Sequence, residues 1–185
     1  MSGQADGRRE RGRQRREAII AATLAVVERD GVAGVTHRTV AREADVAASS
    51  AVYYFATLDD LLVAALSAAA QEYADQLAAL RDGGRDPIDG IAELIAAAGG
   101  PGRQRALAER ELTLMASRRP ALRPLAGHWR EQVAEAARTR TDDPVTVDAV
   151  VAAADGICAR VLLDEEPIGF ERIRAVLRHA LHLPE

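Results

Sequence analysis

The chain has 185 residues, with 24 arginines, no lysine, 28 acidic residues and a formal net charge of −4 at neutral pH. This length is sufficient for one extended helical unit, or for a small head and a larger body, with a substantial core. The single cysteine excludes an intrachain disulfide framework. We find neither the apolar stretch of a secretory signal nor a transmembrane segment, and therefore expect a cytoplasmic protein with no membrane partner.

The charge is unevenly distributed. Residues 1–58 carry nine arginines and seven acids, a net +2, whereas residues 59–185 carry fifteen arginines and twenty-one acids, a net −6. An acidic body is repelled by nucleic acid and orients the basic end toward it. We expect residues 1–15 to form a flexible arginine-rich arm that follows DNA phosphates or enters the minor groove. The arginines of this arm that we assign to DNA are Arg8, Arg9, Arg11 and Arg13.

A first helix is predicted over residues 16–30, because apolar residues recur there at helical spacing and Gly31 ends the run. Residues 36–55 then have the pattern of two short helices joined by a tight turn. Thr36 can cap the first of them through its hydroxyl. The turn falls at Asp45, since aspartate adopts left-handed backbone angles more readily than most residues, and the second helix begins near residue 47.

Two helices that cross over such a turn place the second one in the major groove of DNA. Residues 16–56 are therefore predicted to be a helix-turn-helix DNA-binding domain. Residues 57–185 are predicted to be helical throughout, starting with a capping-box-like Thr57 and Asp60 and a long helix to about residue 80. Glycines and Asp-Pro pairs divide the rest into further helices at about 86–98, 103–117, 124–137, 144–163 and 169–181.

Residues 16–62 carry a specific pattern of residue types. Its members are Arg16-x-x-Ile19, Ala21-Ala22, Gly31, Thr36, Val40-Ala41, Ala44, Val46, Tyr54-Phe55 and Leu58-Asp59-Asp60-Leu61-Leu62. In spacing and order this segment resembles the TetR family of bacterial transcriptional regulators. The resemblance implies an all-α fold, with a three-helix head that contains the helix-turn-helix and a six-helix body (residues 57–185) for ligand binding and dimerisation.

Four positions depart from the family pattern. Asp45 stands where the turn glycine is expected, Val52 where a tyrosine is expected, Ser49 where a glycine is common, and Leu58 where a lysine is expected. Set against the family pattern, these departures imply that two phosphate contacts are missing. Because affinity for a duplex depends largely on neutralised phosphates, we expect the arginine-rich arm to supply replacements.

The DNA contacts are assigned to the helix-turn-helix. The fork of Arg38 suits guanine O6 and N7, although the alternative is a solvated surface arginine. One of Tyr53 and Tyr54 is expected to reach a phosphate and the other to pack, with core packing open for Tyr54. The second helix of the motif, which we call the reader helix, carries few side chains that can form hydrogen bonds. Discrimination between DNA sequences is therefore expected to use few direct hydrogen bonds plus DNA shape. The assigned residues are Thr36, His37, Arg38, Ala48, Ser49, Ser50, Tyr53 and Tyr54.

The resemblance implies a small apolar or amphipathic effector, of unknown identity, in a cavity of the body, whose binding releases DNA. The candidate lining residues are Tyr73, Leu112, Met115, His128 and Trp129; the alternative is that they fill the core. The histidines lack a plausible third metal ligand, so we expect no metal and no cofactor.

The last two helices are predicted to form the dimer surface, where pairing with their symmetry mates gives a four-helix seam. Small residues near Gly156 would permit close approach. The alternative is that the apolar stripes pack only within one subunit. A two-fold dimer with reader helices about 34–36 Å apart predicts an inverted-repeat operator. The stripe residues are Val147, Val150, Val151, Ala154, Ile157, Val161, Phe170, Ile173, Leu177 and Leu181.

The sequence is consistent to different degrees with three function classes. The leading one is a ligand-responsive regulator, most simply a repressor, that binds a palindromic double-stranded operator as a homodimer. An all-helical enzyme is disfavoured, because no nucleophile and base pairing, paired carboxylates or phosphate-cradling glycine loop is found, and no catalytic residue is assigned. The remaining alternative is a helical adaptor or interaction protein without specific DNA binding.

Overall fold

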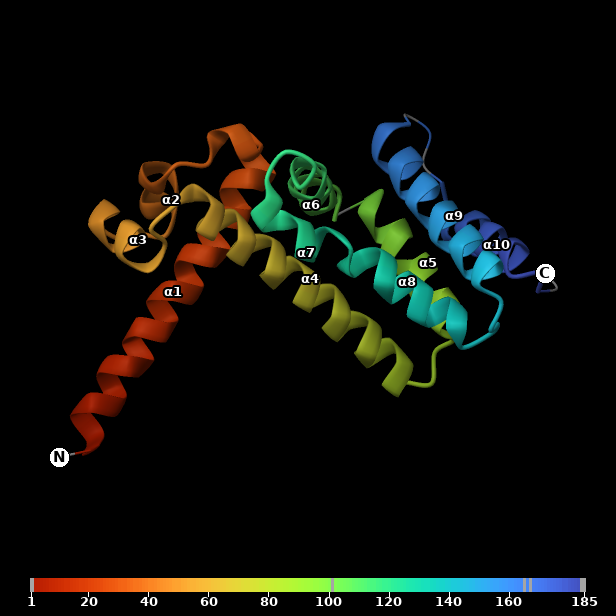
Figure 1. Cartoon of the computed structure of the whole chain (residues 1–185), viewed down its shortest axis with the longest axis horizontal. Helices are drawn as coiled ribbons and strands as arrows, with labels where there is room; N and C mark the ends of the chain where they lie inside the picture. Colours follow the sequence, from red (N-terminus) through yellow and green to blue (C-terminus); the bar gives the residue numbers. More distant parts are fainter. Residues whose placement is uncertain (1, 101, 165, 167, 184–185) are drawn as a thin grey trace. The chain divides into compact units, whose positions relative to one another are not determined.

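The computed structural model describes residues 2–100, 102–164, 166 and 168–183, and the side chains of all of these except residues 2–6 and 8. The chain is helical, as predicted, and the described residues contain no strand (Figure 1). It divides into two compact units, of which unit 1 is Met1–Ala68 with Ala108–Leu125, and unit 2 is Ala69–Leu107 with Ala126–Glu185.

Unit 1 contains the predicted head. Its elements are α1 (Ser2–Asp30), the short 3-10 helix η1 (Val32–Gly34), α2 (His37–Glu43), α3 (Ala48–Tyr54), the start of α4 (Leu58–Asp82), the end of α6 (Arg103–Met115), the 3-10 helix η2 (Pro120–Leu122) and most of α7 (Arg123–Ala126). Apolar faces of α1 to α4 meet in its core, where Ile19, Val40 and Leu61 have no exposed surface. This burial fixes the three head helices against the start of α4.

The local signals in the head are confirmed. Thr36 caps α2, since its Oγ1 accepts a hydrogen bond from the backbone N–H of Thr39 at 3.0 Å, and the Thr39 hydroxyl is 2.9 Å from the Thr36 nitrogen in return. Asp45 has a φ of 51° and makes the turn. The N–H of Thr57 donates to Asp60 Oδ2 at 2.9 Å, and the Asp60 N–H donates to the Thr57 hydroxyl at 3.1 Å, so the predicted capping box opens α4.

The first helix is longer than predicted. It begins at Ser2 and not at residue 16, so the segment expected to be a flexible arm is described as the first half of α1. Arg13 forms ion pairs with Glu10 at 2.7 Å and Glu17 at 3.2 Å, at the three- and four-residue spacings that bring side chains together on a helix. These pairs support helical backbone in a segment that contains several glycines.

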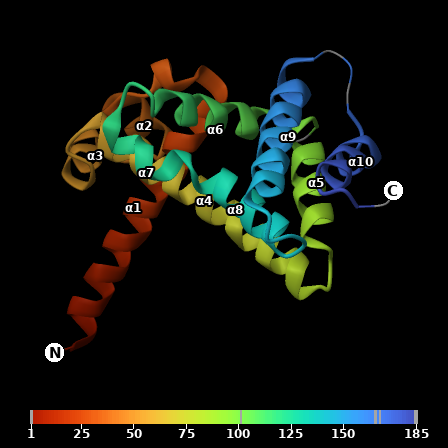
Figure 2. The ribbon, with the colours of Figure 1, turned by 45° about the vertical axis from the view of Figure 1, so that its right-hand side comes forward.

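Unit 2 is a bundle of α5 (Pro87–Ala98), α8 (His128–Arg138), α9 (Pro144–Leu163) and α10 (Phe170–Ala180), together with the end of α4 and the start of α6. These four helices lie together in both ribbon views (Figures 1 and 2). Their core centres on residues such as Ile91, Val133, Val150 and Ile173. The two Asp-Pro signals are confirmed as caps of α5 and α9. The single helix predicted over 124–137 is instead α7 and α8, which are separated at Gly127.

The apolar stripe assigned to the dimer surface packs largely inside the protomer. Eight of its ten residues are buried in the core of unit 2, and Val151 and Phe170 pack partly against that core. These side chains are therefore not free to contact a partner. They pack within one subunit, as in the alternative prediction. The eight are Val147, Val150, Ala154, Ile157, Val161, Ile173, Leu177 and Leu181.

Among the described residues, no helix taken alone has both the length and the apolar composition needed to cross a bilayer. Only α3 and α4 considered together, at 75° to each other, meet such a test, and they do so on length and composition alone.

Candidate nucleic-acid interface and effector site

The outer face of α3 is open to solvent. Ala48, Ser49 and Tyr53 are exposed and Ser50 is partly exposed, while Ala51 on the inner face is fully buried. Burial of the inner face holds the helix, which leaves short polar groups and methyls on the outer face. This face can enter a groove of DNA because nothing in unit 1 covers it among the described residues.

The two tyrosines at the end of α3 have different surroundings. Tyr53 is 82% exposed, whereas Tyr54 is partly buried and its hydroxyl lies near Gly12 of α1. Their rings meet edge to face, with centroids 5.1 Å apart. Tyr54 therefore packs α3 against α1, and Tyr53 is the tyrosine that presents a free face to a phosphate.

His37 connects the two helices of the motif. It is partly buried, and its Nε2 lies 2.7 Å from the backbone oxygen of Phe55, which can only accept, so Nε2 carries the proton and donates. This bond fixes the start of α2 against the end of α3. His37 therefore acts first as a positioning residue within the head, which leaves only its Nδ1 for an outside partner.

Arg38 and Thr36 lie at the start of α2. Arg38 is exposed and forms no ion pair with any side chain that the structure describes, so its guanidinium can reach outward. Thr36 is exposed as well, but its hydroxyl is used in the cap of α2. Nearby, Arg29 bridges to Glu43 at 2.7 Å and joins α1 to α2. Hydrogen bonds to Asp30 and Glu43 raise the pKa of Arg29 above its ordinary range, so it stays charged.

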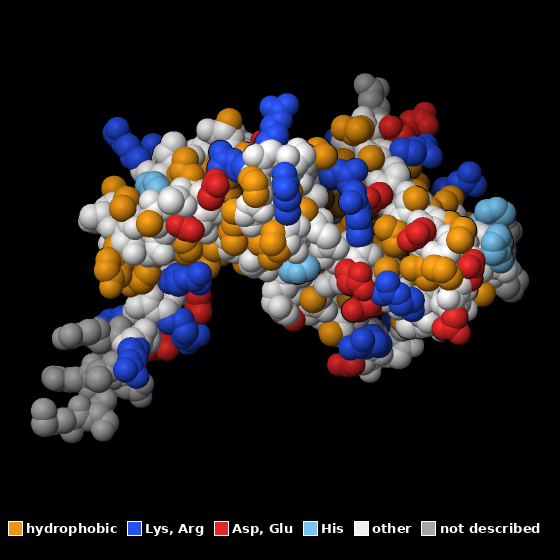
Figure 3. All heavy atoms as spheres, in the orientation of Figure 1, with side chains coloured by type: hydrophobic (Ala, Val, Ile, Leu, Met, Phe, Trp, Pro, Cys, Tyr) orange, Lys and Arg blue, Asp and Glu red, His pale blue; other side chains and the backbone are white. Residues whose placement is uncertain are grey.

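Arginine side chains, with a few acidic ones among them, lie along the first half of α1 (Figure 3). Arg9 and Arg11 are exposed, and the side chain of Arg8 lies outside the described residues. Arg13 is exposed but hydrogen-bonds to Glu10, which lowers the pKa of that carboxyl. Exposed ion pairs contribute little to stability, so a DNA phosphate can replace these carboxylates as the partner of an arginine at a small cost in free energy. The helical segment can thus supply the phosphate contacts expected of the arm.

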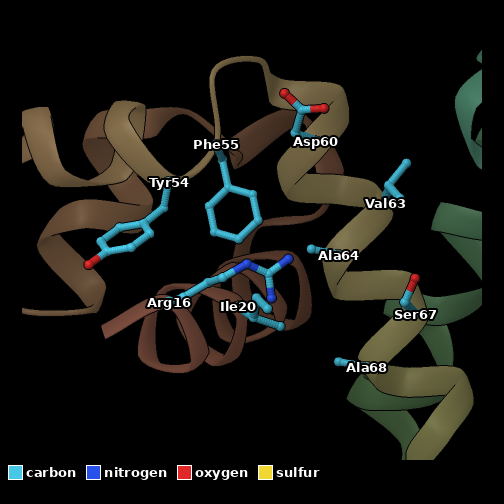
Figure 4. A pocket seen from close by; sticks show the side chains of 9 residues that line it. All are labelled: Arg16, Ile20, Tyr54, Phe55, Asp60, Val63, Ala64, Ser67 and Ala68. Atoms are coloured by element: carbon cyan, nitrogen blue, oxygen red, sulfur yellow. The ribbon is translucent and has the colours of Figure 1, made fainter. Parts of the chain in front are cut away.

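An unanticipated contact joins α1 to the end of α3. The guanidinium of Arg16 lies 5.0 Å from the centre of the Phe55 ring, within the range of a cation–π interaction (Figure 4). The contact borders a groove of about 580 Å³ that α1, the end of α3 and the start of α4 line. Arg16 and Phe55 both belong to the sequence pattern of residues 16–62. Their contact was not predicted, because it depends on the tertiary arrangement of segments 39 residues apart.

The head is also bound to the end of α6 within unit 1. Arg119 forms an ion pair with Asp59 in the first turn of α4. Gly31, with a φ of 71°, lies so close to Glu111 that a Cβ there would be 3.3 Å from Oε2. The second half of α6 and the segment after it are thus structurally part of the DNA-binding unit.

The candidate effector residues fall in both units. In unit 2 the rings of Tyr73 (α4) and Trp129 (α8) have centroids 5.9 Å apart and an interplanar angle of 56°, and His128 is exposed. Leu112 and Met115 belong to unit 1, where Leu112 has no exposed surface and serves the core. Within the described part of the chain, no group of three or more His, Cys, Asp or Glu side chains is arranged to hold a metal.

A three-helix head with a capped helix-turn-helix and an open outer face on its second helix defines a helix-turn-helix DNA-binding protein. Two family profiles match the chain: the "Bacterial regulatory proteins, tetR family" profile over residues 19–65, and the "Tetracyclin repressor-like, C-terminal domain" profile over residues 82–183. The chain belongs to the TetR family of bacterial transcriptional regulators. These regulators are non-enzymatic, and a comparison with curated proteins gives no match.

Solved structures agree with this membership. The multidrug binding protein EbrR complexed with imidazole is 45% identical, with 92% of this chain and 97% of that chain covered and a TM-score of 0.77. EbrR complexed with ethidium is 46% identical, with 90% and 97% covered and a TM-score of 0.77. A TetR-family member from Streptomyces coelicolor A3 (SCO1917) is 45% identical, with 92% and 99% covered and a TM-score of 0.79. EbrR has also been solved with malachite green and with proflavin.

Proposed function

We propose that this TetR-family regulator is a homodimeric repressor, which binds a palindromic operator through α3 of each protomer and leaves it when a small molecule binds the body. The observation that carries the proposal is the outer face of α3, which stays exposed while Ala51 and Phe55 anchor the inner face. An adaptor without specific DNA binding has no use for an exposed α3 held beside a basic helix.

The proposed DNA contacts divide by chemistry. Arg38 reads a guanine edge, and Ser49 and Ser50 donate to bases or phosphates, with Ala48 against a thymine methyl. Tyr53, together with Arg9, Arg11 and Arg13 of α1, binds phosphates, which position the protein without specifying sequence. Thr36 and His37 support these groups from within the head through the cap of α2 and the bond to Phe55, and Tyr54 through its packing on α1.

The dimer surface that we propose is the outer face of α9. Small and apolar residues are exposed opposite its buried stripe, with Val145 73% and Leu163 77% exposed at its two ends. Gly156 lies between them, and a Cβ built there would meet no described atom within 4 Å apart from its chain neighbours and the adjoining backbone of α9. Large exposed apolar groups around small residues suit close pairing of two helices across a two-fold axis. The exposed residues between the two ends are the small Ala149, Ala152 and Gly156 and the charged Asp148 and Arg160.

We propose aromatic cations as the effector class. The EbrR structures, at 45–46% identity over at least 90% of this chain, hold ethidium, malachite green and proflavin, which share a cationic aromatic system. In this chain the ring pair of Tyr73 and Trp129 offers the faces against which such a molecule stacks. Binding there releases DNA if the occupied body favours a head spacing unsuited to the operator.

The test begins with the duplexes that the purified protein retains from a random library. Fluorescence anisotropy on the retained sequence should show affinity that falls steeply between about 50 and 200 mM salt. Arg38→Ala should weaken binding at least about fivefold, because a bidentate contact to guanine discriminates by about 1–3 kcal/mol. Arg81→Ala, at an exposed arginine of unit 2, is the control and should bind as the wild type does. Salt-independent binding, or equal behaviour of both variants, contradicts the proposal.

A further inference from the structure

A buried oxygen in unit 2 lacks a hydrogen-bond donor. Gln132 lies on α8 with its side chain partly buried, and its Oε1 is fully buried without a donor from the described part of the chain. Removing a carbonyl oxygen from water without giving it a donor is unfavourable, and folded proteins contain few such groups. An acceptor of this kind calls for a physical explanation.

The neighbours of Gln132 point to its role. Trp129 precedes it by three residues on α8, and side chains at this spacing adjoin on a helix surface. The Trp129 ring is also the one that contacts Tyr73 of α4. Unit 2 therefore contains two aromatic rings in contact, and the unpaired oxygen belongs to a residue one turn along α8 from one of these rings.

We propose that Gln132 is a specificity-determining residue of the effector site, and that its Oε1 accepts a hydrogen bond from an N–H of an aromatic amine whose ring lies against Tyr73 and Trp129. This inference rests on the proposed effector function and adds a requirement to it. A neutral amide selects for the donor and not for the charge. A ligand without the N–H leaves the buried oxygen unpaired, which is how a polar site rejects an otherwise similar molecule.

Two dyes separate the donor from the ring. Proflavin carries two primary aromatic amines, and acridine orange carries the same acridine ring with dimethylamino groups in their place. Calorimetric titration of the full chain should show that Gln132→Met lowers proflavin affinity about tenfold and acridine orange affinity less than about twofold. Gln104→Met, at an exposed glutamine of α6, is the matched control and should change neither affinity.

The melting temperature of the ligand-free variant provides a second readout. Because Oε1 has no donor among the described residues, Gln132→Met removes a buried unsatisfied acceptor and should not lower the melting temperature. An equal loss for both dyes, or a lower melting temperature, overturns the role assigned to Gln132. If the wild type binds neither dye, the proposed effector class is wrong. This result differs from the two above, which contradict only the role of Gln132.

Discussion

Tyr53 and Tyr54 are adjacent in sequence, yet only Tyr53 is free to contact DNA. Tyr53→Phe removes an exposed hydroxyl, so operator affinity should fall about tenfold or more, the effect of one hydrogen bond to a charged group, with an unchanged melting temperature. Tyr54→Ala removes packing between α3 and α1 and should lower the free energy of unfolding by about 2–4 kcal/mol. Anisotropy measures the operator affinity of Tyr53→Phe and of Tyr54→Phe, and urea denaturation measures the stability of Tyr54→Ala. A greater affinity loss for Tyr54→Phe than for Tyr53→Phe would reverse the assignment.

At the scale of single residues, the sequence predicts features that depend only on a residue and its neighbours in the chain. The Thr36 cap and the turn at Asp45 follow from each residue's own chemistry, and the structure confirms both. The bond from His37 to the Phe55 oxygen spans 18 residues, and the Arg16 contact with the Phe55 ring spans 39. Such contacts exist only after α1, α2 and α3 have packed, so residue type alone does not predict them.

Among the elements, the basic first half of α1 can be tested for helical structure in solution by a substitution at Gly12. A Cβ at Gly12 would meet only the Tyr54 hydroxyl at 3.5 Å, an ordinary contact, and alanine favours a helix by about 1 kcal/mol over glycine. Gly12→Ala should therefore raise helicity in far-UV circular dichroism and raise stability. At Gly34 a Cβ would lie 2.6 Å from Asp30 Cβ, so Gly34→Ala should destabilise the head. No gain at Gly12 would contradict a helical first half of α1.

The cap of α9 gives a pH dependence. Hydrogen bonds from the hydroxyl and then the N–H of Thr146 lower the pKa of Asp143 below its usual value of about 3.9. A lowered folded-state pKa contributes stability above pH 4 that is lost as the pH falls through it. Asp143→Asn should lose less in melting temperature than the wild type between about pH 5 and pH 2. Asp142→Asn, exposed and outside the cap, is the control; equal losses for Asp143→Asn and wild type would exclude the cap as the cause.

Sequence patterns predict the starts of helices better than they predict what each apolar helix face packs against. Capping residues next to proline mark the starts of α5 and α9, and the structure confirms both. The apolar periodicity of α9 predicts a surface for a partner, but in the structure this stripe forms the protomer's own core. Periodicity identifies a buried face without saying what buries it. The exposed Val145 and Leu163 on the other face gave no periodic signal strong enough to compete.

For the whole molecule, Gly156 tests how two protomers meet. A leucine there has open space within the protomer, so Gly156→Leu should keep the monomer fold and its circular dichroism spectrum while blocking close approach of a second α9. Sedimentation velocity should show a monomer where the wild type is a dimer. Gly127→Leu, also in open space but outside α9, should remain dimeric. A dimeric Gly156→Leu protein would place the interface elsewhere.

The symmetry of the bound DNA tests the central claim most directly. Duplexes that the purified protein retains from a random library should converge on an inverted repeat, with half-site centres about one helical turn or a multiple of it apart, because two copies of α3 enter successive major grooves. Retained sequences without two-fold symmetry, or no enrichment over the starting library, would contradict a homodimer that reads an operator through α3.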